Sequence, residues 1–295
     1  MKPVDIFCAV LVAVIWGLGF VASRLALDEL SPAMMTALRF VIAAVPCLFI
    51  RKPDVPWRVL IVISLAMFLV QFLAQSYGIA MGVPVGLTSV IVQSQALFTV
   101  AFAAIVFRER PTAMQLLGIA IASCGLLMIS GTVGFDFTVG AFLVLMISPI
   151  SFAAGNLLLR LANDAPMFDL FAWLYLIPPL PLLAWALATD GPQATWHDLT
   201  HMTWSGIVSM LAIGILTTSF GYWLWGRLLR LYTPAQVTPF ALLVPFIGAA
   251  ASAVVFHETF GMLRLAGMLT VVFGIAVMLL SRRTAASAPA PTGAS

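Results

Sequence analysis

The chain is built from ten apolar segments, and the second five repeat the spacing of the first five. Each set carries a Glu that is followed by Gly after nine and after sixteen residues: Glu109, Gly118 and Gly125 in the first, Glu258, Gly267 and Gly274 in the second. Upstream, Gly19 to Arg24 is echoed by Gly155 to Arg160, and Asp28 by Asp164. Since five is an odd number, two membrane-embedded copies must run in opposite orientations. Inverted repeats enclose the alternating central site of many transporters.

The composition predicts an integral membrane protein. Apolar residues make up 62% of the 295 residues and charged residues only 8%, too few to cover the surface of a soluble domain. The net charge of +3 comes from basic residues dispersed singly and in pairs, so no nucleic-acid partner is expected. Cys8, Cys47 and Cys124 lie in apolar segments without metal-ligand spacing, so we expect packing roles and neither a metal nor a cofactor.

We expect an all-α integral membrane fold of ten transmembrane helices, arranged as two inverted five-helix repeats. The first apolar run is too long for a cleavable signal and is expected to be the first span. The helices are placed roughly at residues 6–27, 33–50, 58–81, 85–107, 113–130, 138–161, 168–188, 203–230, 235–256 and 262–280. The repeats then occupy residues 1–132 and 133–281, followed by a disordered cytoplasmic tail at 282–295.

Lys and Arg positions predict the orientation. With both termini in the cytoplasm, Arg24 and Arg264 fall on the outer side, and Arg39 lies within the second span. This arrangement satisfies the positive-inside rule. Eleven basic residues fall on the inner side: Lys2, Arg51, Lys52, Arg58, Arg108, Arg110, Arg160, Arg227, Arg230, Arg282 and Arg283.

An ordered set of motifs resembles the EamA-type carriers of the drug/metabolite transporter superfamily. The motifs are Ile15-Trp16-Gly17 with Gly19-Phe20, Leu38-Arg39-Phe40, Phe98-Thr99, Phe107-Arg108-Glu109-Arg110, Gly118 with Gly125, Val244-Pro245 and Phe256-His257-Glu258. The resemblance covers residues 5 to 280. It implies that helices 1, 3, 4, 6, 8 and 9 surround a substrate cavity, with helices 5 and 10 packed peripherally. The expected location, as a multi-pass protein of the bacterial inner (plasma) membrane, is also what this resemblance implies.

Further stretches resemble the O-acetylserine/cysteine exporter branch of that family. They are Gly86-Leu87-Thr88-Ser89, Gln93-Ser94-Gln95-Ala96, Gly155-Asn156, Gly221-Tyr222, Trp225-Gly226 and Leu242-Leu243-Val244-Pro245. The branch implies export of amino-acid-like metabolites by alternating access. Gly19 and Leu159 depart from its pattern, where Asn and a basic residue are typical. The alternative is a carrier of another small organic solute, such as a drug, purine or sugar.

Polar residues within the spans are the candidate substrate-binding groups, because they are costly in hydrocarbon and normally face a cavity or a partner. Gln71 and Gln75 are four residues apart and share one helix face. Gln93 and Gln95 are two apart and point in different directions. We expect one of this second pair to meet substrate and the other to bond a neighbouring helix, and the sequence leaves open which.

Asn156 lies mid-span in the sixth helix, where it is interpreted as a cavity residue or as a structural hydrogen-bonding group. Trp16, Tyr222 and Trp225 could wall a pocket for an organic amine, or belong to an interfacial aromatic belt. These residues complete the predicted substrate-binding set.

Charged residues are given mostly structural interpretations. Arg39 either snorkels to the interface, pairs with Asp28 or Glu29, or attracts a carboxylate substrate, and the pairing is favoured. Glu109 and Glu258 are interpreted as caps at the starts of helices 5 and 10.

Two further features bear on mechanism and chemistry. Pro149, Pro239 and Pro245 predict interruptions of helices 6 and 9. His197 and His201 are four apart, which is a weak signal for a metal.

The sequence places no Asp or Glu in the middle of a span, so a carboxylate proton relay is not evident and facilitated exit is the simpler hypothesis. No nucleophile with His or paired acids lies at membrane depth, so we expect no enzymatic activity. The expected partners are a small-molecule substrate and the lipid bilayer, with the protein acting as a monomer or homodimer.

Overall fold

The computed structural model describes residues 1–162 and 165–286. Asp164 and residues 287–295 of the predicted tail lie outside the described part. Within the described residues, nine helices are long and apolar enough to cross a membrane, and a shorter apolar helix, Pro32–Leu48, completes the predicted ten. The chain is therefore a multi-pass, all-helical membrane protein, as the sequence predicts.

The first repeat forms five spans, several of them divided into shorter helical pieces. They are α1 (Pro3–Leu27); α2 (Pro32–Ala44) with the 3-10 turn η1 (Val45–Leu48); α3 (Trp57–Ser64), the π-helical η2 (Leu65–Val70) and α4 (Gln71–Ala80); α5 (Val85–Gln93) with α6 (Gln95–Val106); and α7 (Ala113–Ser130).

The second repeat forms five spans and one additional surface helix. The spans are α8 (Val139–Leu158) with η3 (Leu159–Ala162); α9 (Met167–Leu174) with α10 (Pro179–Thr189); α12 (Trp204–Leu211), the π-helical η4 (Ala212–Phe220) and α13 (Gly221–Leu231); α14 (Pro234–Val237), the 3-10 turn η5 (Thr238–Leu242) and α15 (Leu243–Phe256); and α16 (Met262–Ala286). The surface helix α11 (Pro192–Thr200) lies in the loop between α10 and α12.

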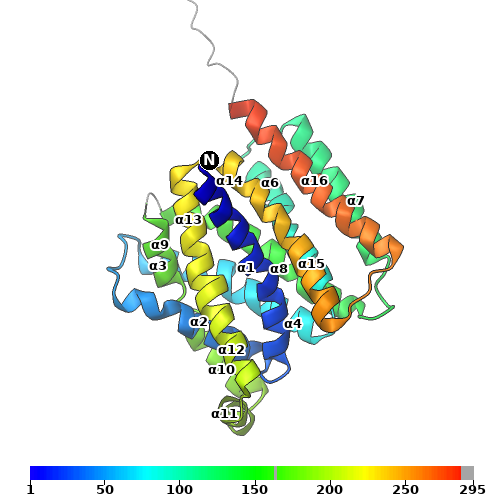
Figure 1. Ribbon diagram of the computed structural model, residues 1–295. Coiled ribbons are helices and arrows are strands. Elements are labelled where there is room, and N and C mark those ends of the chain that lie inside the picture. Colours follow the sequence, from blue (N-terminus) through cyan, green and yellow to red (C-terminus); the bar gives the residue numbers. More distant parts are fainter. Residues whose placement is uncertain (163–164, 287–295) are drawn as a thin grey trace, which may run out of the picture.

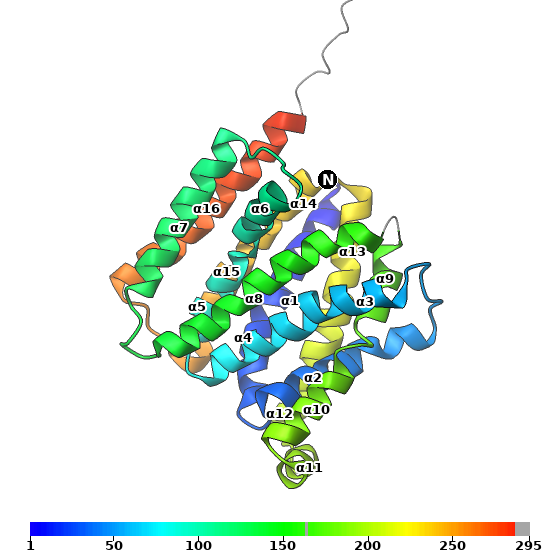
Figure 2. The same ribbon diagram turned by 180° about the vertical axis from the view of Figure 1, so that it is seen from behind.

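The spans pack as one bundle whose two ends are distinct. The N-terminus and the last turn of α16 lie at the same end, and α11 lies at the opposite end (Figure 1). Viewed from behind, α8 and α4 cross the middle of the molecule side by side, and α7 and α16 form one edge (Figure 2). The end with the N-terminus is called the amino-terminal end below. The helix α16 reaches Ala286, past its predicted end at residue 280.

The third and eighth spans carry matching π-helical segments, and each packs against a glycine of the other repeat. A Cβ at Gly155 of α8 would lie 2.8 Å from the Cα of Met67 in η2, and a Cβ at Gly19 of α1 would lie 2.5 Å from Cγ2 of Thr217 in η4. Gly19 and Gly155 are the repeat-related glycines of the sequence. The duplication is therefore visible in the packing between the two halves.

The fifth and tenth spans cross at the four glycines that the sequence repeats. A Cβ at Gly118 would lie 2.6 Å from the carbonyl oxygen of Gly274, and a Cβ at Gly125 would lie 2.8 Å from that of Gly267. Such contacts require glycine, because small residues let membrane helices approach closely. The order of these contacts makes α7 and α16 antiparallel, as inverted repeats require, and Figure 1 shows the two helices side by side.

The fourth and ninth spans end in the same unusual turn. Arg108 and His257 are 149 residues apart in the sequence, and both have φ of 54°, in the left-handed region. A Glu directly follows each of these residues, and the two carboxylates have different partners. Glu258 accepts hydrogen bonds from the amides of Val85 and Gly86 at 2.6 and 3.0 Å, at the start of α5.

Glu109 instead pairs with Arg160 at 2.8 Å. Thr112 and Gln115 form the capping box at the start of α7. The prediction that Glu109 and Glu258 cap helices 5 and 10 is therefore wrong, because each carboxylate reaches across to another span.

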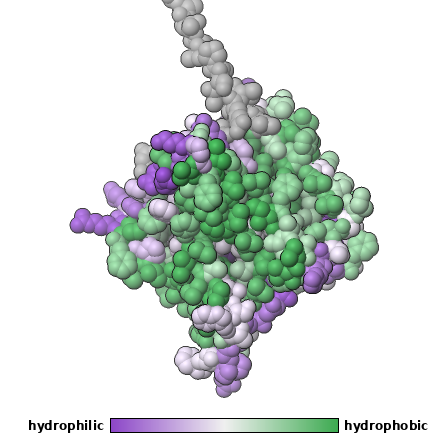
Figure 3. All heavy atoms as spheres, viewed as in Figure 1, coloured by the Kyte–Doolittle hydropathy of each residue, from purple (hydrophilic) through white to green (hydrophobic). Residues whose placement is uncertain are grey.

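The outer surface is apolar over much of its area. Apolar side chains cover most of the face in Figure 3, and hydrophilic ones gather towards its margins. Ile105 and Leu180 are each 76% exposed and Leu127 is 70% exposed. A surface of this kind needs an apolar surrounding, which a bilayer supplies.

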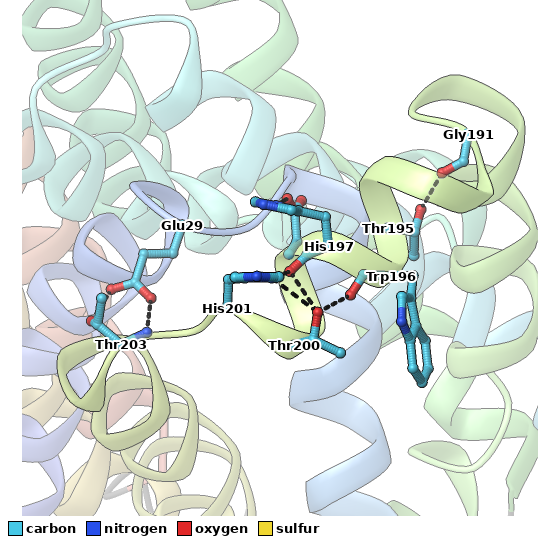
Figure 4. Close-up of polar contacts among 9 residues, drawn as sticks. Glu29, Gly191, Thr195, Trp196, His197, Thr200, His201 and Thr203 are labelled. Carbon is cyan, nitrogen blue, oxygen red and sulfur yellow. Dashed lines mark hydrogen bonds and ion pairs between the residues drawn. The ribbon is translucent and has the colours of Figure 1, made fainter.

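At the end that carries α11, Glu29 holds the first two spans to the eighth. Its carboxylate accepts hydrogen bonds from the amide of Thr203, at 2.7 Å, and from the Thr203 hydroxyl (Figure 4). A Cβ at Gly206 would lie 2.3 Å from Oε2 of Glu29, so glycine is needed for this approach. The hydrogen bond from the Thr203 hydroxyl is the main cause of a lowered pKa at Glu29.

His197 and His201 of the same loop stack with ring centroids 4.1 Å apart (Figure 4). Among the described residues, no group of three or more His, Cys, Asp or Glu side chains is placed to hold a metal ion.

Gly274→Ala should destabilise the protein, because the new Cβ would lie 2.4 Å from the amide nitrogen of Ala122. Overpacking of this kind typically costs about 1–3 kcal/mol, measurable as a lower Tm in detergent. Gly261→Ala is the matched control, since no atom lies within 4 Å of its built Cβ. Equal Tm values for the two variants would contradict the glycine contact between α7 and α16.

Glu29 should make stability depend on acidity. Its ionised form is stabilised in the folded protein, so the contribution is complete above the ordinary pKa of 4.5 and is lost as the pH falls through the lowered folded pKa. The Tm advantage of the wild type over Glu29→Gln should therefore shrink on acidification below that range. Thr203→Val removes the hydroxyl that is the main hydrogen-bond donor to Glu29. In that background, Glu29→Gln should change the pH dependence of Tm less than it does in the wild type. A pH-independent advantage would show that the carboxylate's charge is not involved.

Candidate functional site

A cavity of about 390 Å³ lies between the two repeats. All eight predicted binding residues are among those that line it: Trp16, Gln71, Gln75, Gln93, Gln95, Asn156, Tyr222 and Trp225. Their role in binding remains a prediction, but the structure brings all eight to one chamber. The polar members are selected in the sequence because polar groups within a span are costly in hydrocarbon, with structural roles as the open alternative.

More spans contribute to the cavity than the family resemblance implies. Helices 1, 3, 4, 6, 8 and 9 line it as expected, but Arg39 of the second span and Phe171 of the seventh do so as well. The tenth span, expected at the periphery, supplies Ile275, Met278 and Leu279. The glycines of α16 pack against α7, and these three side chains lie at the cavity, so the same helix contacts both α7 and the cavity.

The fourth span is divided beside the cavity, and this break separates the roles of its two glutamines. α5 ends at Gln93 and α6 begins at Gln95, with Ser94 between them. Nε2 of Gln93 donates to the carbonyl oxygen of Ala241 at 2.7 Å, within the 3-10 segment η5 of the ninth span. Gln93 therefore joins the two repeats at the points where both helices are interrupted.

Oε1 of Gln95 is buried and has no hydrogen-bond partner, although the side chain lines the cavity. The same holds for Oε1 of Gln71, which begins α4 immediately after the π-helical turn. A buried polar atom without a partner costs about 1–3 kcal/mol. Both oxygens belong to side chains that line the cavity, although the oxygen atoms themselves are buried.

Asn156 makes one weak contact, from Nδ2 to Oγ1 of Thr99 at 3.5 Å. Thr99 donates to the carbonyl of Gln95 at 2.7 Å, so the pair joins the sixth span to the start of α6. Both Asn156 and Thr99 line the cavity. The cavity and hydrogen-bonding interpretations of Asn156 therefore both describe its position.

Three aromatic side chains form one wall. The Trp16 ring lies 5.3 Å from that of Tyr222 and 5.2 Å from that of Trp225, measured between centroids. Nε1 of Trp16 donates to the carbonyl oxygen of Thr217 at 3.0 Å, which fixes the indole against η4. The cluster is thus part of the cavity and not an interfacial belt.

Arg39 does not pair with Asp28 or Glu29, so the favoured prediction is wrong. Asp28 pairs with Arg24, and Glu29 is engaged by Thr203. Arg39 points inward and is 6% exposed, because α2 buries this face against the eighth span.

The remaining lining includes residues that the sequence analysis did not select. Met67, Phe72, Phe152 and Phe171 give the cavity apolar walls, and Thr217 adds a hydroxyl. The adjacent Thr217, Thr218 and Ser219 in an apolar span were a signal that could have indicated the eighth helix. The phenylalanines carried no such signal, since apolar residues fill every span.

The cavity extends to the amino-terminal end of the bundle. Its lining includes Met167, the first residue of α9, and Leu229, near the end of α13. At the other end, the bonds of Glu258 to α5 and of Glu29 to Thr203 join the spans.

Gln93→Ala and Gln95→Ala should have different effects. The first removes the bond to Ala241 and leaves a carbonyl unpaired, so Tm in detergent should fall by the equivalent of about 1–3 kcal/mol. The second removes an unpartnered oxygen, so Tm should be unchanged or higher while transport falls. The reverse pattern would contradict the hydrogen-bonding assignment.

The inverted spans, the interrupted fourth and ninth helices and the central cavity have the architecture of membrane carriers built from inverted repeats. The EamA-like transporter family model matches residues 4–131 and 139–280, so the chain belongs to the EamA-like transporter family. The predicted family is thereby confirmed.

Relatives match over nearly the whole chain. A "Probable amino-acid metabolite efflux pump" of Salmonella typhimurium is 34% identical, covering 97% of this chain and 99% of that protein. One of Escherichia coli with the same description is 31% identical, covering 96% and 97%. A "Probable terminal-alkyne amino-acid exporter" of Streptantibioticus cattleyicolor is 28% identical, covering 95% and 94%.

The fold also resembles that of a solved crystal structure. The TM-score is 0.65 at 16% sequence identity, and the match covers 96% of this chain and 99% of the other. This likeness supports the architecture of the ten spans.

Proposed function

We propose that the protein exports amino-acid-like metabolites, of the cysteine or O-acetylserine type, across the bacterial inner membrane. The observation that carries the proposal is a cavity between inverted repeats that is lined by the amide side chains of Gln71, Gln95 and Asn156. Amide groups both donate and accept hydrogen bonds, as a zwitterionic amino acid requires. The names of the Salmonella and Escherichia relatives support the same substrate class.

Both termini are proposed to face the cytoplasm. The N-terminus and the last turn of α16 lie at one end of the bundle (Figure 1). Basic residues gather at the same end: Arg227 pairs with Asp5 near the N-terminus, and Arg160 pairs with Glu109. Under the positive-inside rule this end is assigned to the cytoplasm, and the cavity lining reaches towards it through Met167 and Leu229.

Transport proceeds by rocking of one repeat against the other, without a protein carboxylate as proton carrier. Among the described residues that line the cavity, none is Asp or Glu. Exit down the substrate gradient is therefore the mechanism that this lining supports.

Overexpression should raise resistance to toxic amino-acid analogues and increase release of cysteine and O-acetylserine into the medium. Gln71→Ala and Asn156→Ala should each lower the release about tenfold, as expected for one lost hydrogen bond to substrate, at unchanged membrane abundance. Gln236→Ala, an exposed residue outside the cavity, is the matched control. Unaltered release in both cavity variants would place the substrate elsewhere, and release of a purine or sugar alone would favour a different solute.

A further inference from the structure

Arg39 is the one charged side chain among the described residues that line the cavity. Its Nε donates to the hydroxyl of Thr218 at 2.9 Å, and Nη2 donates to that of Thr217 at 3.3 Å. The guanidinium carbon lies 4.0 Å from the centroid of the Phe72 ring. These contacts fix the position of the group but leave its charge without a counterion.

A buried cation normally has a carboxylate partner, because its removal from water costs more than neutral hydrogen bonds return. The acidic residues that pair with arginine in the described part of the chain are Asp5, Asp28, Glu109 and Asp136, and their partners are Arg227, Arg24, Arg160 and Arg264. None of them pairs with Arg39. The position of Arg39, at 6% exposure and on the cavity wall, leaves a site for a negative charge that the protein itself does not supply.

We infer that Arg39 binds the carboxylate of the transported solute and thereby restricts transport to molecules with a free acid group. The planar guanidinium matches a carboxylate in geometry and forms strong charge-assisted hydrogen bonds with it. Phe72, which lies against the guanidinium, directly follows Gln71 in the chain. The charge therefore lies beside the helix that presents the unpartnered amide oxygen of Gln71.

The amino group of such a solute meets weaker partners. The amide side chains of Gln71 and Gln95 line the cavity, and the faces of Trp16, Tyr222 and Trp225 favour a cation. No carboxylate lines the described cavity to hold an ammonium by itself. The acid group is therefore the main determinant of binding, and organic cations without one are repelled by Arg39.

This inference rests on the proposed function and is tested by comparing an amino acid with its ester. The wild-type protein in proteoliposomes is assayed by counterflow of labelled S-methyl-L-cysteine. Unlabelled S-methyl-L-cysteine should compete at least tenfold more strongly than its methyl ester, in which the carboxylate is replaced by a neutral ester. Equal competition by acid and ester would overturn the role of Arg39 and leave the proposed function standing. Failure of every amino acid to be transported, with transport of a cationic dye, would overturn both.

Variants separate a binding role from a structural one. Arg39→Gln should weaken competition by the acid at least tenfold and leave competition by the ester unchanged or stronger, because the repulsion of the ammonium is removed, and Arg39→Lys should give an intermediate ratio. Thr218→Val is the structural control, because it removes a bond between α2 and η4 and keeps the charge. If Arg39 only ties these helices, both Arg39→Gln and Thr218→Val will lower Tm and keep the wild-type ratio of acid to ester. If Arg39→Gln does not fold, the proposal is tested by the ratio of acid to ester competition in the wild type and in Arg39→Lys.

Discussion

A membrane-embedded bundle has to pair its own backbone wherever a helix is irregular, because hydrocarbon offers no hydrogen bonds. The π-helical segment η4 meets this constraint with adjacent hydroxyls. Thr218 donates to the carbonyl of Ile213 at 2.8 Å, and Ser219 donates to that of Gly214 at 3.2 Å. In the first repeat the hydroxyl comes from another span, since Ser151 of α8 donates to the carbonyl of Ala66 in η2 at 2.6 Å. The irregular segments around the cavity therefore depend on specific polar side chains.

The same constraint links the cavity to the architecture. The breaks in the fourth and ninth spans meet through Gln93 and Ala241, and the π-helical segments are held by glycine contacts from the opposite repeat. Each irregularity thus lies where one half of the molecule touches the other. Polar side chains at these places serve the backbone, and the amide oxygens of Gln71 and Gln95 beside them stay buried and unpaired.

Much of this could be predicted from the sequence because apolar length and repeat spacing are properties of the chain alone. The ten spans, the inverted halves and the cavity position of residues such as Gln71 and Asn156 follow from them. Contacts between distant spans could not be predicted in this way. Gln93 bonds Ala241 at the place where the fourth span breaks at Ser94. The packing of the helices places Arg39 against the eighth span and not beside Glu29.

The paired turns at Arg108 and His257 have a consequence for the energetics of the carrier. A left-handed backbone at a residue with a side chain costs about 1–2 kcal/mol, and the molecule contains this cost twice, once near each face. Because the same backbone cost occurs near both faces, it cancels in the free-energy difference between the state open to one compartment and the state open to the other. The preference is then set by unequal features, such as the bonds of one carboxylate to backbone amides and of the other to an arginine.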